Sequence, residues 1–441
     1  MKLNKLVSLF YWSFILIVAL APCQAFAQYR QAWIVGGWYD RRDYASDITL
    51  DAAGNIYVGG STGDIYGTPS TTLYSGAVAA KFDPDGNRQW LRNAYTTRSL
   101  DHVADVGVDG SGNVFIAGET YRYTTGAEAY IVKFSSTGTR LWERHLGTPD
   151  NEFGMSLAVD SLGNAYVGGS TTGDLVGGGK HGYDPFVAKY SSNGSLLWMK
   201  QYADPTLNEY PVSMSISPGH GIYLGFGGTI DGGLARLDEA GELVWFQNPD
   251  YSAVSSLRTD ISGITSDASG NVYATGVSDF SYNGSFSGGK AVVAKHASDG
   301  TLLWSVKIPS LFQSSATDVT LDSLGNVYIC GAMSRGSAGL GLGDNDAFWA
   351  KYNSQGDLLW FEQFGNEYSA SGLTVDQLGR VYVVARQSRN LNGYYGADAD
   401  VGLIRFDPVP EPAAMSLAAI MMIAWSTVPR TRLKKWATFS K

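Results

Sequence analysis

A short signature recurs along the chain at nearly constant spacing, and it constrains the fold more than any other feature of the sequence. It reads Asp-x-x-Gly-Asn-x-Tyr or Phe and lies between two apolar, strand-like segments, as in Asp51–Tyr57. Five copies keep the motif, and Ser217–Tyr223 and Asp376–Tyr382 are degenerate copies. The Asn position falls at 55, 113, 164, 220, 271, 326 and 380, so successive copies are 51 to 58 residues apart. A fixed period of this length indicates a repeat architecture with seven units.

Each repeat predicts two β-hairpins. The Asp begins a tight turn, and Gly with Asn tolerates the positive φ angles of short hairpin loops. After each of the first six copies comes a second signature: an apolar strand ending in Lys or Arg, a turn with Gly, and a Trp. The pairs are Lys81/Trp90, Lys133/Trp142, Lys189/Trp198, Arg236/Trp245, Lys295/Trp304 and Lys351/Trp360. Four antiparallel strands in a repeat of about 50 residues are the blade of a β-propeller.

The seventh repeat contains Leu403-Ile404-Arg405-Phe406 but no Trp strand after it. The missing strand is predicted at the other end of the chain, where Gln31–Val35 resembles the Trp strand Gln89-Trp90-Leu91. We therefore expect an all-β, seven-bladed propeller in which an N-terminal strand completes the last blade. Such closure pairs edges that would otherwise be exposed.

These repeats resemble the SBBP family of β-propeller repeats. The best copies are the third-strand segments Asp184–Lys189 and Asp346–Lys351, together with the Asp-x-x-Gly-Asn-x-Tyr hairpins. The resemblance covers nearly all of residues 28–408. It implies the propeller fold and brings no catalytic residues with it.

The N-terminal segment 1–27 is predicted to be a secretory signal peptide. Lys2 and Lys5 precede an apolar run from Leu6 to Ala21, and Ala25-Phe26-Ala27 supplies the small residues of a cleavage site. The alternatives are a lipoprotein signal with Cys23 as the lipidated residue, although Pro22 fits such a motif poorly, and a retained N-terminal anchor.

The C-terminal segment 409–435 is predicted to be a sorting signal. Pro410-Glu411-Pro412 precedes the apolar stretch Ala413–Val428 and a basic tail that includes Arg430 and Arg432. This pattern resembles the PEP-CTERM signal of Gram-negative bacteria, which implies transient membrane anchoring through a short helix and processing by an exosortase-type enzyme. It departs from the pattern at Pro429 and in the length of the tail after Lys435. A short permanent membrane anchor is the alternative, although sixteen residues are few for a transmembrane helix, which needs about 20.

Composition limits the functions that remain. The chain is 44% hydrophobic and 17% charged, with a formal net charge of −9. Nucleic-acid binding is not expected, because phosphate recognition needs clustered Lys and Arg. Cys330, inside the strand-like run 327–331, is expected to be a small buried apolar residue.

The tight turns of every blade should lie on one face, so the longer loops gather on the other face, where ligand-binding residues usually reside. Acidic residues begin several third strands on that face. One interpretation is structural: each acid caps a turn or pairs with a neighbouring blade. The other is functional: the acids form a carboxylate ring that binds a cation. Acidic–aromatic pairs before the inner strands supply aromatic rings that either wedge between blades or hold a sugar or a cationic group. The candidate ligand-binding residues are Glu128, Asp184, Asp231, Asp346, Asp400, Tyr44, Phe153, Tyr210 and Tyr368.

No catalytic, cofactor-binding or metal-binding set is predicted. The repeated Trp residues also occur in propeller quinoproteins, but six regular copies are better explained by packing between blades. Asp83–Asn87 resembles the start of a Ca²⁺ loop without the bidentate Glu, and the five histidines lack metal-ligand spacing.

The leading hypothesis is a non-catalytic scaffold or binding protein, displayed at the cell surface or released into the extracellular matrix of a Gram-negative bacterium. Its expected partners are surface polysaccharide or another matrix protein. The alternatives are a periplasmic or extracellular propeller enzyme, glycan-acting or quinoprotein-like, and a purely structural spacer.

Overall fold

The computed structural model confirms the all-β prediction. It describes residues 28–36, 43–63, 75–94, 100–122, 126–179, 182–202, 210–227, 232–251, 258–282, 286–287, 289–310, 313–334, 345–364, 368–387, 390–391, 394–395 and 401–409. The chain divides into two compact units, residues 31–407 and residues 1–30 with 408–441. The predicted signal peptide and sorting signal lie outside the described residues, apart from Val409 at the end of the last strand.

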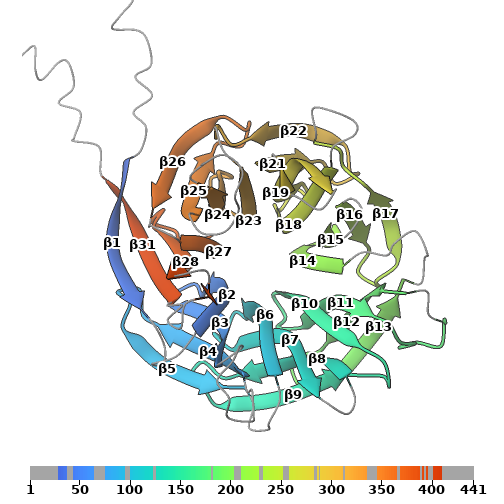
Figure 1. Cartoon of the computed structure of the whole chain (residues 1–441). Helices are drawn as coiled ribbons and strands as arrows, with labels where there is room; N and C mark the ends of the chain where they lie inside the picture. The colour runs from blue at the N-terminus through green and yellow to red at the C-terminus, as the bar shows by residue number, and fades with distance from the viewer. Residues whose placement is uncertain are drawn as a thin grey trace, which may run out of the picture. The chain divides into compact units, whose positions relative to one another are not determined.

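Residues 31–407 contain the seven predicted blades, drawn as a ring in Figure 1. Blade 1 has β2 (Asp43–Leu50), β3 (Ile56–Gly63), β4 (Ser75–Phe82) and β5 (Arg88–Asn93). Blade 2 has β6 (Leu100–Val108), β7 (Val114–Arg122), β8 (Gly126–Phe134) and β9 (Arg140–Leu146). Blade 3 has β10 (Glu152–Val159), β11 (Ala165–Thr171), β12 (Asp184–Tyr190) and β13 (Leu196–Gln201). Blade 4 has β14 (Tyr210–Ser217), β15 (Gly221–Gly227), β16 (Gly233–Leu237) and β17 (Leu243–Gln247).

The remaining blades follow the same plan. Blade 5 has β18 (Arg258–Ser266), β19 (Val272–Tyr282), β21 (Lys290–His296) and β22 (Leu302–Lys307), with the short β20 (Phe286–Ser287) paired to β19. Blade 6 has β23 (Ser314–Leu321), β24 (Val327–Ser334), β25 (Asn345–Tyr352) and β26 (Leu358–Phe364). Blade 7 has β27 (Tyr368–Val375), β28 (Val381–Gln387) and β31 (Val401–Val409). A two-stranded ribbon, β29 (Asn390–Leu391) and β30 (Tyr394–Tyr395), lies between the last two in sequence.

The ring closes as the sequence predicted. The fourth strand of blade 7 is β1 (Gln28–Gly36), and the strand order of that sheet is β1-β31-β28-β27. The first strand of every blade contacts the first strand of the next, and β27 contacts β2 to complete the circle. The two ends of residues 31–407 therefore lie in one sheet, so that loss of β1 would expose the edge of β31.

The repeated hairpin turn is built as its residues require. In blade 1 the Asp51 carboxylate accepts hydrogen bonds from the Ala53 and Asn55 amides, from the Asn55 side chain and from the Tyr57 hydroxyl, at 2.7 to 3.0 Å. Gly54 has a φ of 79°, a left-handed conformation that glycine adopts without strain. These bonds hold the pKa of Asp51 below its ordinary value in spite of burial, which opposes them.

The core lies between the blades as well as within them. The Tyr or Phe of each motif is fully or nearly fully buried, and Tyr57, Tyr223, Tyr273, Tyr328 and Tyr382 are at or below 1% exposure. The ring of Tyr57 packs near Trp90 in its own blade, and its hydroxyl donates to Gly112 O of blade 2 at 3.4 Å. One residue thereby links turn formation, blade packing and the contact to the next blade.

Candidate functional site

The two ends of the propeller differ in construction. We call the end that carries both tight turns of each blade the turn face, and the opposite end the loop face. On the turn face of blades 1, 2, 3 and 6 the inner turn lies against the outer turn of the same blade; a side chain at Gly112, for example, would meet Ser136 and the Tyr57 hydroxyl. Most of the long connections of the loop face lie outside the described residues.

Three of the predicted carboxylates are engaged inside their own blades. Each lies on a third strand and faces the neighbouring fourth strand: Glu128 lies 3.4 Å from His145 Nδ1, Asp184 accepts a hydrogen bond from Gln201 Nε2 at 2.8 Å, and Asp346 accepts one from Gln363. Asp184 and Asp346 are each only 1% exposed. The structure therefore gives each of these acids a partner within its own blade. Asp231 and Asp400 lie outside the described residues.

The predicted aromatic residues separate into two groups. Tyr44 lies at the junction of blades 1 and 7, where the Arg386 guanidinium stands 4.3 Å from its ring centre. Its ring therefore packs between two blades, which is the structural one of the two roles considered from the sequence. Tyr368 is half-buried at the start of β27. Phe153 and Tyr210 begin β10 and β14, so they lie at the loop end of the junction between blades 3 and 4.

Phe153 and Tyr210 are joined by an aromatic residue that the sequence reasoning missed. Tyr183, directly before β12, lies with its ring centre 6.1 Å from that of Phe153 and 5.1 Å from that of Tyr210. Tyr183 is 36% exposed, and Phe153 and Tyr210 are half-buried. We call Phe153, Tyr183 and Tyr210 the aromatic surface. Burial, together with the neighbouring Tyr183, raises the pKa of Tyr210 to about 12, so the Tyr210 side chain is a neutral phenol at neutral pH.

The loop that precedes Tyr183 is held by its own hydrogen bonds. The Asp174 carboxylate accepts from the amides of Gly177, Gly178 and Gly179 at 2.6 to 3.1 Å. Gln201 donates to Gly173 O and Gly179 O and accepts from the Leu175 amide. Because Gln201 also binds Asp184, the loop is anchored to the strand that begins next to Tyr183. The aromatic surface is thus supported on a preorganised scaffold.

A hollow of about 310 Å³ adjoins the aromatic surface. It is lined by Met155, Tyr210, Val212, Gly227, Asp260, Ile261 and Ser262, from the loop ends of blades 3, 4 and 5. A Cβ at Gly227 would lie 3.0 Å from Asp260 Oδ1, so glycine at this position keeps space beside the carboxylate. Tyr210 belongs to both features, so the hollow and the aromatic surface are continuous.

On the turn face, regular hydrogen bonds join neighbouring blades. The indole N–H of the repeated Trp donates to a carbonyl in the outer turn of the next blade, at 3.1 Å each time: Trp90 to Ser136, Trp142 to Ser192, Trp245 to Ser298 and Trp304 to Ser354. We call this bond the indole latch. It confirms a role in packing between blades for these four tryptophans.

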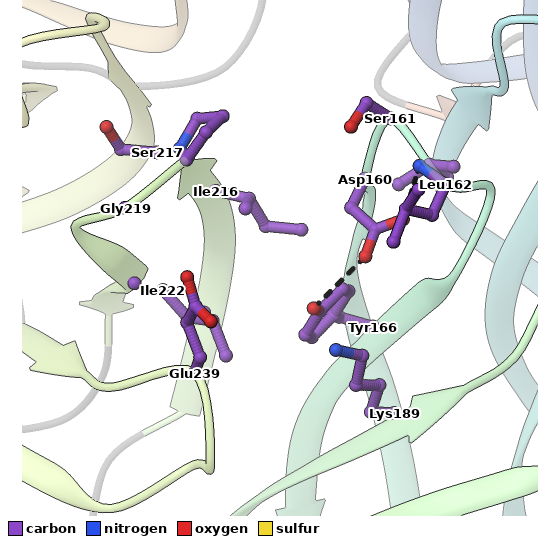
Figure 2. Close-up of a pocket in the computed structure, with 13 residues that line it drawn as sticks. Asp160, Ser161, Leu162, Tyr166, Lys189, Ile216, Ser217, Gly219, Ile222 and Glu239 are labelled. Atoms are coloured by element: carbon purple, nitrogen blue, oxygen red, sulfur yellow. Dashed lines mark hydrogen bonds between the residues drawn. The ribbon is translucent and has the colours of Figure 1, made fainter.

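The junction of blades 3 and 4 lacks the indole latch. Within the described part of the chain, Trp198 makes no hydrogen bond to the outer turn of blade 4, and a cleft of about 280 Å³ lies between the two blades (Figure 2). In Figure 2, Lys189, Tyr166 and Asp160 face Glu239 and Ile216 across this cleft. Lys189 Nζ stands 4.8 Å from the Tyr166 ring centre and makes no hydrogen bond or ion pair with a described residue.

The degenerate turn of blade 4 explains the cleft. Ser217 occupies the position of the motif Asp, and its hydroxyl donates to Asp267 O of blade 5 at 2.9 Å. The His220 ring lies against Gly270 of the same blade. A side chain at Gly219, in the same turn, would meet nothing within 4 Å. No residue of this cleft was singled out as a ligand-binding residue from the sequence.

Three carboxyl groups on inner strands form a separate cluster. Asp47, Asp105 and Asp318 follow equivalent β-bulges in blades 1, 2 and 6. Asp105 accepts from the Leu157 amide at 2.7 Å and Asp318 from the Leu373 amide at 2.8 Å, so each links its blade to the next. Burial raises the pKa of Asp105 to about 6 and that of Asp318 to about 8, and burial with the adjacent Asp105 raises the pKa of Asp47 strongly.

No set of three or more His, Cys, Asp or Glu residues suited to hold a metal ion occurs among the described residues. The described part of the chain likewise contains no helix with the length and apolar character needed to cross a bilayer. Cys330 is fully buried, as predicted, and burial raises the pKa of its thiol well above the ordinary value. A raised thiol pKa disfavours the reactive thiolate.

Comparison with known proteins supports the class that the fold defines, a β-propeller built from sequence repeats. The SBBP family, described as a beta-propeller repeat, matches residues 142–175, which run from the Trp strand of blade 2 to the first hairpin of blade 3. The comparison with curated proteins found no match.

Several solved structures are similar to this chain at low sequence identity. A protein of unknown function from Dyadobacter fermentans is 11% identical, with 86% of this chain and 99% of that chain covered and a TM-score of 0.50. An ulvan lyase, described as a polysaccharide lyase, is 11% identical with 87% and 96% covered and a TM-score of 0.47. The β-propeller domain of a protease from Pyrococcus furiosus is 10% identical with 79% and 93% covered and a TM-score of 0.45. The match to the Dyadobacter fermentans protein supports the fold alone.

Proposed function

We propose that this protein is a non-catalytic binding propeller that works at the surface of a Gram-negative cell, in contact with exopolysaccharide. The aromatic surface is the observation that carries the proposal. It is partly exposed, it is supported by the hydrogen-bonded loop 172–179, and it adjoins a hollow with a single carboxylate in its lining. Concave apolar sites with a few placed polar groups are the usual form of a ligand-binding site.

The two terminal segments supply the rest of the proposal. The N-terminal segment is proposed to direct export, and Pro410-Glu411-Pro412 with the apolar and basic residues after it is proposed to anchor the protein transiently until an exosortase-type enzyme processes it. Another matrix protein is the second proposed partner. The net charge of −9 favours solubility and opposes adsorption to anionic surfaces.

Two measurements test this proposal. Cell fractionation of the producing bacterium should place the full-length protein in the surface and extracellular fractions, and deletion of residues 409–441 should change that distribution. The purified protein should co-sediment with polysaccharide extracted from the same cells. Recovery only from the cytoplasm, or no co-sedimentation at any salt concentration, would contradict the proposal.

The enzyme hypothesis makes a different prediction for the same preparation. A glycan-acting enzyme would release new reducing ends or shorten the polysaccharide during incubation, and a quinoprotein would carry a cofactor absorbance. We expect the protein to bind the polysaccharide without shortening its chains.

A further inference from the structure

We infer that the cleft between blades 3 and 4 on the turn face binds a small zwitterion of the amino-acid type. Its carboxylate pairs with Lys189 and its ammonium group with Glu239 on the facing wall. The site lies on the opposite face from the aromatic surface, and it does not depend on polysaccharide binding. It concerns recognition only, with no bond made or broken.

The first argument is an ammonium group that no side chain or carbonyl engages. Lys189 is half-buried in the cleft wall, with its Nζ 4.8 Å from the Tyr166 ring centre, and it makes no hydrogen bond or ion pair with a described residue. The equivalent Lys133 binds both Asp109 and Ser192 O at 3.1 Å. A lysine has three N–H donors, so Lys189 can bind the carboxylate of a ligand through charge-assisted hydrogen bonds.

A second lysine shows that the cleft, and not the lysine alone, defines the site. Among the described residues, Lys295 of blade 5 also contacts only a tyrosine ring, with its Nζ 4.9 Å from the Tyr273 ring centre. Its junction differs because Trp304 forms the indole latch to Ser354 O of blade 6. Lys295 is therefore a matched control for Lys189.

The second argument is an acid on the facing wall. Glu239 lies in the outer turn of blade 4, at the position that is serine in the four latched junctions. It is exposed, and it makes no hydrogen bond or ion pair with a residue in the described part of the chain. Figure 2 shows Glu239 facing Lys189 across the cleft. A ligand that carries both signs of charge can bridge the two.

The other acid of the cleft is already engaged. Asp160 accepts hydrogen bonds from the Leu162 amide, from the amide and side chain of Asn164, and from the Tyr166 hydroxyl, at 2.8 to 3.3 Å. Glu239 is therefore the acid available to a ligand. A ligand with only a carboxylate would be repelled by Glu239, and one with only an ammonium group would be repelled by Lys189. A zwitterion satisfies both residues.

The remaining lining favours an apolar side chain on the ligand. Leu162 of blade 3, which is 78% exposed, and Ile216 of blade 4 line the two walls. The volume of about 280 Å³ is slightly below that of pockets for drug-sized ligands, so it suits an amino acid or a short peptide.

The cleft is bounded by fixed contacts. A Cβ at Gly241 would lie 2.9 Å from Trp198 Cζ3 at the outer edge of the indole, whereas a Cβ at Gly194 would lie 2.8 Å from Trp142 Cδ2 in the middle of the ring. The outer turn of blade 4 thus meets a different edge of its tryptophan. The Tyr202 hydroxyl donates to Gly241 O at 2.8 Å and joins the two blades at the rim. A ligand can therefore enter without separating the blades.

The test is saturation-transfer NMR on the purified full chain, with the standard amino acids and dipeptides of apolar amino acids as probes. At least one of these zwitterions should bind with a Kd of about 1 mM or lower, and the comparison shows whether a free amino acid or a dipeptide is preferred. The N-acetyl derivative of the best ligand lacks the ammonium group, and its amide lacks the carboxylate. Each derivative should bind at least about tenfold more weakly.

Variants of the two charged residues assign the ligand groups. Lys189→Met and Glu239→Gln should each weaken binding of the zwitterion at least about tenfold. Lys189→Met should abolish the advantage of the parent ligand over its amide, and Glu239→Gln its advantage over the N-acetyl derivative. Lys295→Met should leave the affinity unchanged. Thermal unfolding of each variant shows that the fold is retained.

Three outcomes would overturn the inference. The first is that none of these zwitterions binds, and the second is that the N-acetyl derivative or the amide binds as tightly as the parent ligand. The third is an equal loss of affinity in Lys189→Met and Lys295→Met, which would place the ligand outside the cleft. Co-sedimentation with polysaccharide tests the proposed function separately and is unaffected by these results.

Discussion

The junction of blades 2 and 3 and the junction of blades 3 and 4 are built from the same repeat, yet they differ at both faces. At the first, Trp142 forms the indole latch and Lys133 binds both Asp109 and Ser192 O at 3.1 Å. At the second, Trp198 forms no latch to blade 4 and Lys189 has only the Tyr166 ring beneath it. The loop end of this second junction carries the aromatic surface. The comparison teaches that the ring keeps its closure although the junction of blades 3 and 4 departs from the repeat pattern.

The difference at the turn face has a local cause. Where the motif Asp is present, its carboxylate holds the turn through hydrogen bonds from the amides of the turn itself, as Asp51 and Asp160 show. Where Ser217 replaces it, the hydroxyl binds blade 5, and the turn no longer fills the space next to Tyr166. Tyr202, whose hydroxyl donates to Gly241 O at 2.8 Å, still joins blades 3 and 4 at the rim.

The largest expected change in the free energy of unfolding comes from replacing the two tryptophans, Trp142 and Trp198. Trp142→Ala should lower the free energy of unfolding by about 3 kcal/mol, because it removes a half-buried indole and the hydrogen bond to blade 3. Trp198→Ala should cost about 1 kcal/mol less, because its indole packs on Tyr166 but makes no latch. Urea unfolding of both variants measures the difference. Equal losses would show that the two junctions are equally well joined.

Lys133 and Lys189 occupy equivalent positions in blades 2 and 3, and replacing them should change the free energy of unfolding less than replacing the tryptophans does. Lys133→Met should lower the free energy of unfolding by about 2 kcal/mol, because Asp109, whose side chain is only 7% exposed, would lose its cation. Lys189→Met should cost no more than about 0.5 kcal/mol, since it removes only the cation–π contact. Thermal or urea unfolding at neutral pH provides the measurement. A larger loss for Lys189→Met would mean that the cleft is bridged in solution.

The contacts between inner strands also differ between the two junctions, and this difference should make the stability of the protein depend on pH. Blade 2 joins blade 3 through Asp105, whose pKa is raised to about 6 by burial, whereas Ser156 of blade 3 donates to Pro211 O of blade 4. A carboxyl whose pKa is raised by folding stabilises the protein below its unfolded pKa and loses that contribution as the pH rises through the folded value. The wild type should therefore lose stability between about pH 4 and pH 8, the range set by Asp105 and Asp318.

Asp105→Asn tests this directly. It should be about 1 kcal/mol more stable than the wild type at pH 7, a value reduced for the partial water access of this carboxyl, and should show a weaker pH dependence. Ser156→Ala should shift the free energy of unfolding equally at all pH values. Denaturant titrations from pH 4 to pH 8 provide the data. Parallel pH profiles for the wild type and Asp105→Asn would assign the pH dependence to other groups.

The fold was predictable because the same sequence signals occur in every blade. Seven turn motifs at nearly even spacing, six strand pairs with Lys or Arg followed by Trp, and the Trp33 segment together predicted the blades and the closing strand, which the pairing of β1 with β31 confirms. Each hairpin is decided by local chemistry, such as the Asp51 carboxylate and the left-handed Gly54, so the sequence alone carries the signal.

The site was only partly predictable, because it depends on where side chains from different blades meet. Phe153 and Tyr210 were candidates from their position before inner strands, but Tyr183 belongs to no repeated signature. An aromatic residue immediately before the third-strand acid was the available signal. The cleft was not predictable, because the indole latch uses a backbone carbonyl, and residue types do not show whether a carbonyl is in reach.

The most direct test of the account asks which end of the junction between blades 3 and 4 binds polysaccharide. Hydroxyl-radical footprinting of the full chain, with and without a polysaccharide that it binds, reports the solvent access of individual side chains. We predict that the ligand lowers oxidation of Tyr183 and Tyr210 on the loop face and leaves Leu162, a 78% exposed residue at the cleft, unchanged. Protection of Leu162 and Pro218 with Tyr183 unchanged would place the binding site on the turn face and contradict the account.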